Sequence, residues 1–303
     1  MKLFGMLRAF QGGAAQAEGA PPDLQGMLMH HLLDSNEIEF EIMGRGFVWH
    51  LPQWEPIHLG GLTLDLSPTK HIVFMMLAAI LVLAVFIPVG RAMKGKYANR
   101  APSGVSNAVE ALVLYFRDEV VRRNIGHGAD AYTGYILTLF FFILFMNMLG
   151  LVPFGSTATG NFMVTGALAL VTFVVVEISG IRTLGFKGYM RTIFYAPPGL
   201  HPAGQAIMLV ILTPVEFLGK LTKPFALMVR LFANMMAGHT LVLALLGLIF
   251  MFGTIGPARW GVAGVTITMV SGIMILEVFV ALLQAYIFAM LTAVFIGLIR
   301  HAH

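Results

Sequence analysis

Long runs of apolar residues dominate the chain and predict its helices. Residues 71–90 read HIVFMMLAAILVLAVFIPVG, an uncharged run of the length that spans a bilayer, about 20 residues. Apolar segments at 135–154 and 161–181 follow, joined by the short polar turn STATGN. Two longer apolar segments, at 203–250 and 262–299, complete the chain. The pattern predicts an all-α integral membrane protein with five membrane-embedded helices.

The last two segments are too long for simple spans. At about 1.5 Å per residue they would measure roughly 72 Å and 57 Å, whereas the apolar core of a bilayer is about 30 Å thick. Neither segment carries enough charge for a water-soluble extension. We therefore expect a long, highly tilted helical hairpin over residues 203–299, with Pro214 and Pro224 as candidate bends.

Residues 105–124 follow a different pattern, in which apolar residues recur at helical spacing and charged residues fill the other face. The apolar positions are Val105, Val109, Leu112, Val113, Phe116 and Val120. The charged positions are Glu110, Arg117, Asp118, Arg122 and Arg123. This predicts an amphipathic helix lying on the cytoplasmic membrane surface. A soluble linker helix is the alternative.

Basic residues beside the apolar runs indicate the topology. Arg91, Lys94, Lys96 and Arg100 follow the first run, and Arg182, Lys187 and Arg191 follow the third. Because basic residues gather on the cytoplasmic side, we expect the N-terminus outside and the C-terminus in the cytoplasm. The predicted domains are an external N-terminal segment, 1–67, and a membrane domain, 68–303. The latter comprises a first span at 68–90, the interfacial helix at 105–124, a helical hairpin at 135–181 and the long hairpin at 203–299.

Composition supports this assignment and excludes several classes of function. The chain is 58% hydrophobic and 11% charged, whereas soluble domains carry roughly 25% charged residues. The net charge of +4 is explained by the topology, so we expect no nucleic-acid binding. The absence of cysteine excludes disulfides and thiolate metal sites. We expect no metal and no cofactor. AQA at 15–17 resembles a cleavage site, but Arg8 interrupts the apolar core before it, so we expect no cleavage.

Arg230 stands inside the fourth apolar segment and is the main candidate for function. Lys220 and Lys223 should lie near the cytoplasmic interface and extend to water, which places Arg230 about 10 Å deeper. A guanidinium stays charged there and needs a partner or water. Glu216 lies about four turns away, too far to pair with it. We expect a partner outside this chain; an arginine paired within its own chain is the alternative.

Two polar residues of the last segment, Glu277 and Gln284, are seven residues apart and share a helix face. In an antiparallel pair of helices, residues at equal depth have residue numbers with a constant sum. The sums for His239 with Glu277 and for Arg230 with Gln284 differ by only two, so both pairs fall level in one register. An imidazole beside a carboxylate can relay protons. His239 is about 13 Å nearer the outside than Arg230, which predicts a proton path ending at an ionisable group on another subunit.

Several motifs resemble subunit a of the F-type ATP synthase. KPFALMVRLFANMMAGH and LEVFVALLQAYIF carry the most specific similarity, and MNMLGLVP and HHLLDSNEIEFE add to it. The resemblance implies two offset aqueous half-channels with Arg230 as the essential separator between them. It implies helices packed against a rotating c-ring, whose carboxylates carry the protons, and peripheral-stalk b subunits as further partners. It also implies a bacterial inner membrane as the location.

The resemblance carries the family's polar positions onto Glu216, Asn234, His239, Glu277 and Gln284. Many bacterial members have a carboxylate in place of His239 and a histidine in place of Glu277; this chain has the mitochondrial arrangement. Gly150 replaces an acidic residue found in some members at the outer channel mouth. Asn147, Thr159 and Asn161 are substitutes for it there, or simply packing residues. We expect Glu177 to line the cytoplasmic exit beside Glu216; an interfacial carboxylate near Arg182 is the alternative.

Two other classes of protein compete with this interpretation. A secondary ion transporter with a polar site at the membrane midplane should contain internal repeats, and none is visible. A passive structural subunit would not need Arg230, His239 and Glu277 among apolar residues. In the favoured interpretation the chain catalyses no reaction alone and acts as the proton-translocating subunit of the ATP synthase.

Overall fold

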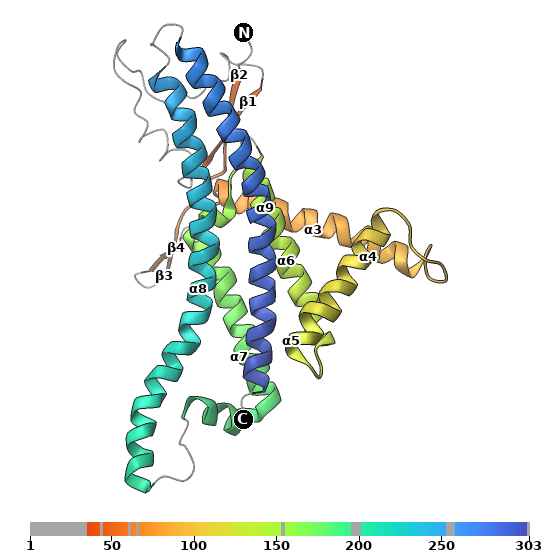
Figure 1. Cartoon of the computed structure of the whole chain (residues 1–303), viewed down its shortest axis with the longest axis vertical. Helices are drawn as coiled ribbons and strands as arrows, with labels where there is room; N and C mark the ends of the chain where they lie inside the picture. The colour runs from red at the N-terminus through yellow and green to blue at the C-terminus, as the bar shows by residue number, and fades with distance from the viewer. Residues whose placement is uncertain are drawn as a thin grey trace. The chain divides into compact units, whose positions relative to one another are not determined.

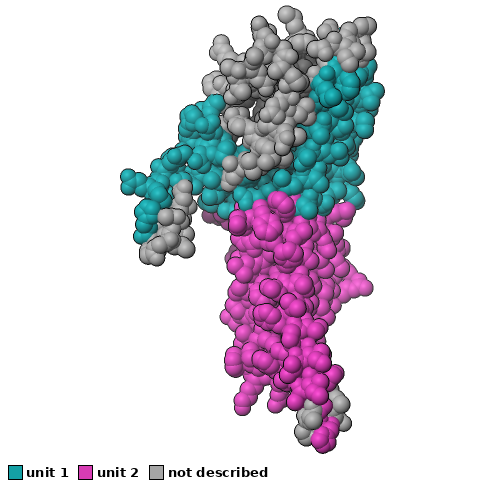
Figure 2. All heavy atoms as spheres, turned by 90° about the vertical axis from the view of Figure 1, so that its left-hand side faces the viewer, with its two compact units in different colours: residues 1–80, 145–161, 233–282 teal, residues 81–144, 162–232, 283–303 magenta. Residues whose placement is uncertain are grey.

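The computed structural model describes residues 35–42, 45–59, 62–64, 67–152, 155–194, 201–252 and 258–301. The candidate cleavage site at 15–17 lies outside these residues. The chain divides into two compact units, which Figure 2 colours separately. Unit 1 contains residues 1–80, 145–161 and 233–282, and unit 2 contains residues 81–144, 162–232 and 283–303.

Among the described residues, five helices are long and apolar enough to cross a membrane. They are α3 (Lys70–Lys94), α6 (Asp130–Leu151), α7 (Phe162–Ile193), α8 (Pro202–Met251) and α9 (Ala258–Arg300) (Figure 1). This confirms the predicted all-α membrane fold with five membrane helices. The helix α7 continues past the predicted end at residue 181, because the basic residues there mark a membrane boundary and do not stop a helix.

The last two helices have the predicted exceptional length. The helix α8 has 50 residues and α9 has 43, so at about 1.5 Å per residue each is roughly twice as long as a bilayer core is thick. The helix α8 continues through Pro214 and Pro224. Figure 1 shows a bend in its first half, which contains both prolines. A proline inside a helix removes one backbone hydrogen bond and favours such bending.

Unit 1 begins with two small antiparallel hairpins that hydropathy did not predict. The strands β1 (Glu37–Ile42) and β2 (Arg45–His50) form one hairpin, and β3 (Ile57–Leu59) and β4 (Leu62–Leu64) form the other. The sequence of β1, EIEFEI, alternates charged and apolar residues, which is the period of a strand. Glu37 faces His50 in the register, and the His50 Nδ1 atom lies 3.1 Å from the Glu37 carboxylate.

The amphipathic segment forms a continuous helical stretch in unit 2. It comprises α4 (Val105–Tyr115), the π-helix η1 (Phe116–Arg122) and α5 (Arg123–Ile125). Its buried side chains are Phe116, Val120, Val121 and Ile125. Phe116 packs on Phe140 of α6, with ring centroids 4.5 Å apart. The segment is helical, as predicted; α4 itself has no buried residue, and the position of the segment on the membrane surface stays a prediction.

Small residues of α9 allow close packing inside unit 2. Ala285, Ala289 and Ala293 recur at four-residue spacing and are fully buried. Gly297 continues the series, and a Cβ atom there would overlap the carbonyl oxygen of Asn124. Small side chains let helix backbones approach closely, a common device in membrane proteins. The sequence of α9 therefore fixes where the amphipathic segment docks.

Replacement of Gly297 by valine should destabilise the protein. The added side chain would force α9 away from Asn124, and overpacking of this kind costs about 1–3 kcal/mol. We expect a lower thermal unfolding temperature for the purified chain in detergent. The matched control is Gly261→Val, also on α9, where a Cβ meets nothing within 4 Å. Equal unfolding temperatures for the two variants would contradict the packing described here.

Candidate functional site

Arg230 lies on the exposed face of α8 in unit 2. Leu227 and Leu231 of the same helix are buried, at 1% and 0% exposure, so the strip of α8 beside Arg230 packs against the protein. Arg230 itself is exposed, as is Asn234 one turn further on. Arg230 and Asn234 are four positions apart, so they lie on one face of the helix.

No carboxylate forms an ion pair with Arg230 within the described part of the chain. Glu216, the acidic residue nearest to it along α8, lies with the cavity described below. A guanidinium remains protonated at any accessible pH. The site therefore presents a permanent positive charge on an apolar helix surface, with no counter-charge from the described residues.

Gln284 of α9 also belongs to unit 2 and is buried, at 2% exposure. Nearby, Lys223 of α8 lies over the ring of Phe295 of α9, 5.6 Å from its centroid. The residue numbers of this contact fit an antiparallel pairing close to the register predicted from the sequence. That register brings Gln284 level with Arg230, to within about one helical turn.

His239 of α8 lies in unit 1, half-buried against the end of α6 and the turn that follows it. Its Nδ1 atom donates a hydrogen bond to the carbonyl oxygen of Met235, one turn earlier, at 3.1 Å. Its Nε2 atom lies 2.8 Å from the hydroxyl of Thr157 and 3.1 Å from the carbonyl oxygen of Gly150. Both ring nitrogens therefore have hydrogen-bond partners.

Glu277 of α9 lies directly against α8 in unit 1. A Cβ atom at position 238 would overlap the Oε1 atom of its carboxylate, so Gly238 makes room for it. Gly238 precedes His239, which places the Glu277 carboxylate beside the imidazole-bearing turn, as the antiparallel register predicts. Glu277 is half-buried. The arrangement allows a proton to pass between an imidazole and a carboxylate.

Asn147 and Thr159 form a buried link in unit 1. Thr159 donates to the side-chain oxygen of Asn147 at 2.7 Å, and the Asn147 amide donates to the carbonyl oxygen of Ala281 at 3.3 Å. Both side chains are fully buried, whereas Asn161 is half-buried. Asn147 and Thr159 thus fix the turn after α6 to α9.

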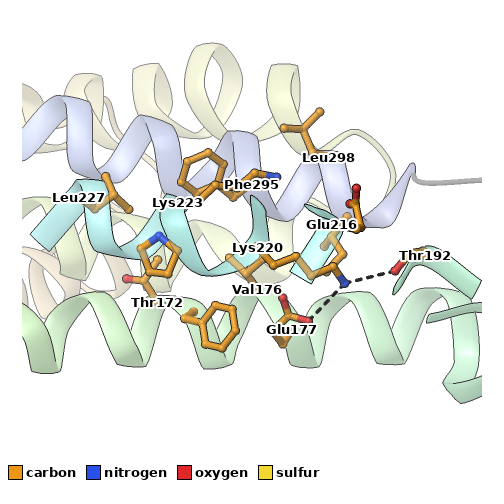
Figure 3. A pocket seen from close by; sticks show the side chains of 13 residues that line it. Thr172, Val176, Glu177, Thr192, Glu216, Lys220, Lys223, Leu227, Phe295 and Leu298 are labelled. Carbon is orange, nitrogen blue, oxygen red and sulfur yellow. Dashed lines mark hydrogen bonds and ion pairs between the residues drawn. The ribbon is translucent and has the colours of Figure 1, made fainter. Parts of the chain in front are cut away.

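A cavity of about 220 Å³ lies in unit 2, between α7, α8 and α9. Glu177, Glu216, Lys220 and Lys223 line it together with apolar side chains. Figure 3 shows Glu177 of α7 and Lys220 of α8 pointing toward each other. The Lys220 ammonium lies 3.8 Å from the Glu177 carboxylate and 3.2 Å from the hydroxyl of Thr192.

A break in α7 supplies a further partner for Glu177. Gly185 has a φ of 69°, a conformation that glycine adopts without strain. In an unbroken helix Tyr189 would lie about 18 Å from Glu177, yet its hydroxyl donates a hydrogen bond to that carboxylate. The break therefore brings Tyr189 back over the cavity, where its ring also carries the Lys220 ammonium at 4.3 Å from the centroid.

Glu177 and Glu216 line the same cavity, and Lys220 is the cation paired with Glu177. Their place at a cytoplasmic exit stays a prediction. The prediction that Lys220 extends to water is wrong, because only 11% of its side chain is exposed. Its ammonium is held by the Glu177 carboxylate and the Tyr189 ring instead.

Thr157 and Tyr189 are the polar contacts that sequence reasoning missed. Thr157 belongs to the STATGN turn, where a threonine reads as a turn residue, and Tyr189 reaches Glu177 only through the break at Gly185. Gly150, which stands where some members of the family have an acidic residue, was the one sequence feature that pointed to a polar contact supplied by another residue such as Thr157. Among the described residues, no group of three or more histidine, aspartate or glutamate side chains could hold a metal ion.

Comparisons with known proteins match this arrangement to one family. The chain matches the family "ATP synthase A chain" over residues 72–297, more than half its length. The "ATP synthase subunit a" of Chloroherpeton thalassium is 45% identical over 270 residues, which cover 89% of this chain and 75% of the relative. The "ATP synthase subunit a 2" of Chlorobaculum tepidum is 44% identical over 294 residues, covering 97% and 77%.

A third relative, the "ATP synthase subunit a" of Anaeromyxobacter dehalogenans, is 44% identical over 303 residues, covering 97% of this chain and 76% of the relative. The chain belongs to the ATP synthase subunit a family. It is thus a membrane protein of the proton-transporting ATP synthase. The matched region contains all the candidate site residues, from Asn147 to Gln284.

Removal of the Lys220 charge should destabilise unit 2. Lys220→Met would leave the Glu177 carboxylate without its cation, and breaking a largely buried pair from one side costs about 3–5 kcal/mol at most. We expect a lower thermal unfolding temperature for the purified chain in detergent. The control is Arg182→Met, which removes an exposed cation of α7, the helix that carries Glu177. A larger drop in unfolding temperature for Arg182→Met than for Lys220→Met would contradict the pairing of Glu177 with Lys220.

Proposed function

We propose that this ATP synthase subunit a is the stator of a proton-driven rotary motor. Protons enter from outside through one aqueous half-channel, bind a carboxylate on a passing c-ring subunit, and leave through a second half-channel to the cytoplasm. Arg230 separates the two half-channels. It lowers the pKa of each arriving ring carboxylate and so forces its proton off. Proton flow is thereby coupled to rotation.

The exposed, unpaired charge of Arg230 carries this proposal. A charge within the apolar part of a bilayer costs at least a few kcal/mol unless it meets a partner or water. Within the described residues no carboxylate of this chain offers that partner. A carboxylate on a moving subunit satisfies the guanidinium only while it is deprotonated, which is the property that a rotary coupling needs.

His239 and Glu277 form the inner end of the external half-channel in this proposal. Their position on the level predicted by the antiparallel register supports it, as do the half-buried environments of both side chains. Asn234 and Gln284 continue the polar route toward Arg230. The driving force is about 2.3 kcal/mol per charge for each 100 mV of membrane potential. A relay must therefore avoid a proton trap much deeper than a few kcal/mol.

The cavity with Glu177 and Glu216 is the cytoplasmic exit in this proposal. Its two carboxylates give a released proton acceptors on the way to water. Lys220 neutralises part of their charge, which keeps a proton from being retained there. The c-ring and the peripheral-stalk b subunits are the protein partners, in a bacterial inner membrane. The N-terminus lies outside and the C-terminus in the cytoplasm, with the 105–125 helical segment on the cytoplasmic surface.

A secondary ion transporter is the alternative function. It would bind its ion in a pocket at the membrane midplane, between repeated halves. No internal repeat is visible in the sequence. This observation favours the stator.

Replacement of Arg230 by alanine should abolish ATP-driven proton pumping by the assembled enzyme. Loss of about 3 kcal/mol of stabilisation lowers a rate about a hundredfold or more. Pumping is measured by fluorescence quenching in proteoliposomes, with assembly checked by co-purification of the partner subunits. Arg191→Ala, which removes an exposed arginine of α7, serves as the control. Normal pumping by an assembled Arg230→Ala enzyme would refute the proposed role, and loss of assembly would favour a structural one.

Exchanging His239 and Glu277 should restore the proton flux that each single replacement loses. His239→Glu and Glu277→His should each lower proton flux about tenfold or more, within the range by which positioned acid–base groups raise rates. The double variant restores one imidazole and one carboxylate at the same level, so its flux should recover to within a few-fold of the original. Independent, multiplicative losses in the double variant would contradict a coupled relay.

A further inference from the structure

The Nε2 atom of His239 faces two groups with different hydrogen-bonding abilities. The carbonyl oxygen of Gly150, at 3.1 Å, can only accept a hydrogen bond. The hydroxyl of Thr157, at 2.8 Å, can donate or accept. Since Nδ1 already donates to the carbonyl of Met235, a neutral ring leaves Nε2 as an acceptor, and a protonated ring makes it a donor. Both states of Nε2 therefore find a partner in place.

We propose that Thr157 is a positioning residue that holds the Nε2 atom of His239 in both charge states. In the neutral ring the Thr157 hydroxyl donates to Nε2. When a proton from external water binds the Nε2 lone pair, the hydroxyl hydrogen rotates away and the new N–H donates to the Gly150 carbonyl. On release of that proton toward Glu277 the hydroxyl hydrogen turns back. This inference rests on the proposed function, in which His239 lies on the external proton path.

The Thr157 hydroxyl does not cap the helix that follows it, although its position is that of a cap. Thr157 precedes the 3-10 helix η2 (Ala158–Gly160), where a threonine commonly caps the helix by accepting a backbone hydrogen bond. Its side chain makes no such bond. It is 7% exposed and turned toward His239. The bond from Thr159 to Asn147 holds the same turn in place.

Gly150 completes the arrangement in two ways. It is the second-last residue of α6, and the last four carbonyls of a helix lack partners within it. The C-terminal end of a helix also carries partial negative charge, which stabilises a nearby cation. In addition, a Cβ atom at position 150 would overlap the Thr157 hydroxyl oxygen. A side chain at this position would therefore push Thr157 off the imidazole.

The charges around His239 are few. Glu277 of α9 faces the imidazole-bearing turn. The described residues of the α6 end in unit 1, 145–151, and of the turn, 152 and 155–161, are all uncharged. On α8 the nearest charged residue is Arg230, nine positions earlier. The proton balance at His239 thus depends on Glu277, the two carbonyl groups and the hydroxyl of Thr157.

The test measures proton conduction through the membrane sector of the whole enzyme in proteoliposomes, across a range of external pH. Thr157→Val keeps the shape of the side chain and removes the hydroxyl. We expect about tenfold slower conduction. We also expect the pH of half-maximal conduction to move upward by about one unit. The neutral ring loses its Nε2 partner, whereas the protonated ring keeps the Gly150 carbonyl. One pH unit corresponds to about 1.4 kcal/mol, roughly one net hydrogen bond.

Two comparisons separate this effect from a general structural one. Thr157→Ser retains the hydroxyl and should retain most of the rate and the original pH profile. Thr292→Val removes a fully buried hydroxyl that bonds only its own helix, at the carbonyl of Phe288, and should leave both unchanged. Gly150→Ala should reproduce the loss and the shift of Thr157→Val by displacing its hydroxyl, and the double variant should be no worse than either single variant.

Several outcomes would overturn the inference. These are normal conduction and pH profile in Thr157→Val, additive losses in the double variant, or failure of Thr157→Val to assemble while Gly150→Ala conducts normally. His239→Ala distinguishes the inference from the proposed function beneath it. If that variant stops conduction while Thr157→Val does not change it, only the role of Thr157 fails. If His239→Ala conducts normally, the proposed path itself fails.

Discussion

A guanidinium on the apolar surface of a membrane helix is the constraint on which the rest of this chain depends. Arg230 cannot lose its proton, and the described residues provide no carboxylate to pair with it. Leu227 and Leu231 on the neighbouring strip of its helix are buried, whereas Arg230 itself is exposed. Such an arrangement is stable only if another subunit or water meets the charge.

The polar groups on either side of Arg230 along α8 have different characters. Toward the C-terminal end of the helix, His239 has hydrogen-bond partners on both ring nitrogens, and Glu277 lies against the adjacent Gly238. An imidazole and a carboxylate can both accept and donate protons. Toward the N-terminal end, Glu177 is tied to Lys220 and Tyr189 at the edge of a cavity. In the proposed function, the fixed positive charge of Arg230 separates a region of proton uptake from a region of proton release.

The membrane helices were predictable because their length and lack of charge are set by the bilayer, and this property is local in the sequence. The level of Glu277 with the His239 turn was also predictable, since antiparallel helices fix residue depth. The hairpin of β1 and β2 could have been predicted from the alternation in EIEFEI, which hydropathy averaging hides. The break at Gly185 could not have been predicted from the sequence. Gly188 lies three positions later, and only the contact of Tyr189 with Glu177 shows which of the two glycines breaks the helix. Likewise, Thr157 gains its role from a histidine 82 positions away.

The distance from the Arg230 guanidinium to the nearest carboxylate in the assembled enzyme tests the central claim most directly. A high-resolution structure of the complete membrane sector would provide it. The account predicts that this carboxylate belongs to a c-ring subunit and comes within about 4–5 Å in its deprotonated position, close to salt-bridge range. A carboxylate of this same chain within about 4 Å, paired stably with Arg230, would contradict it.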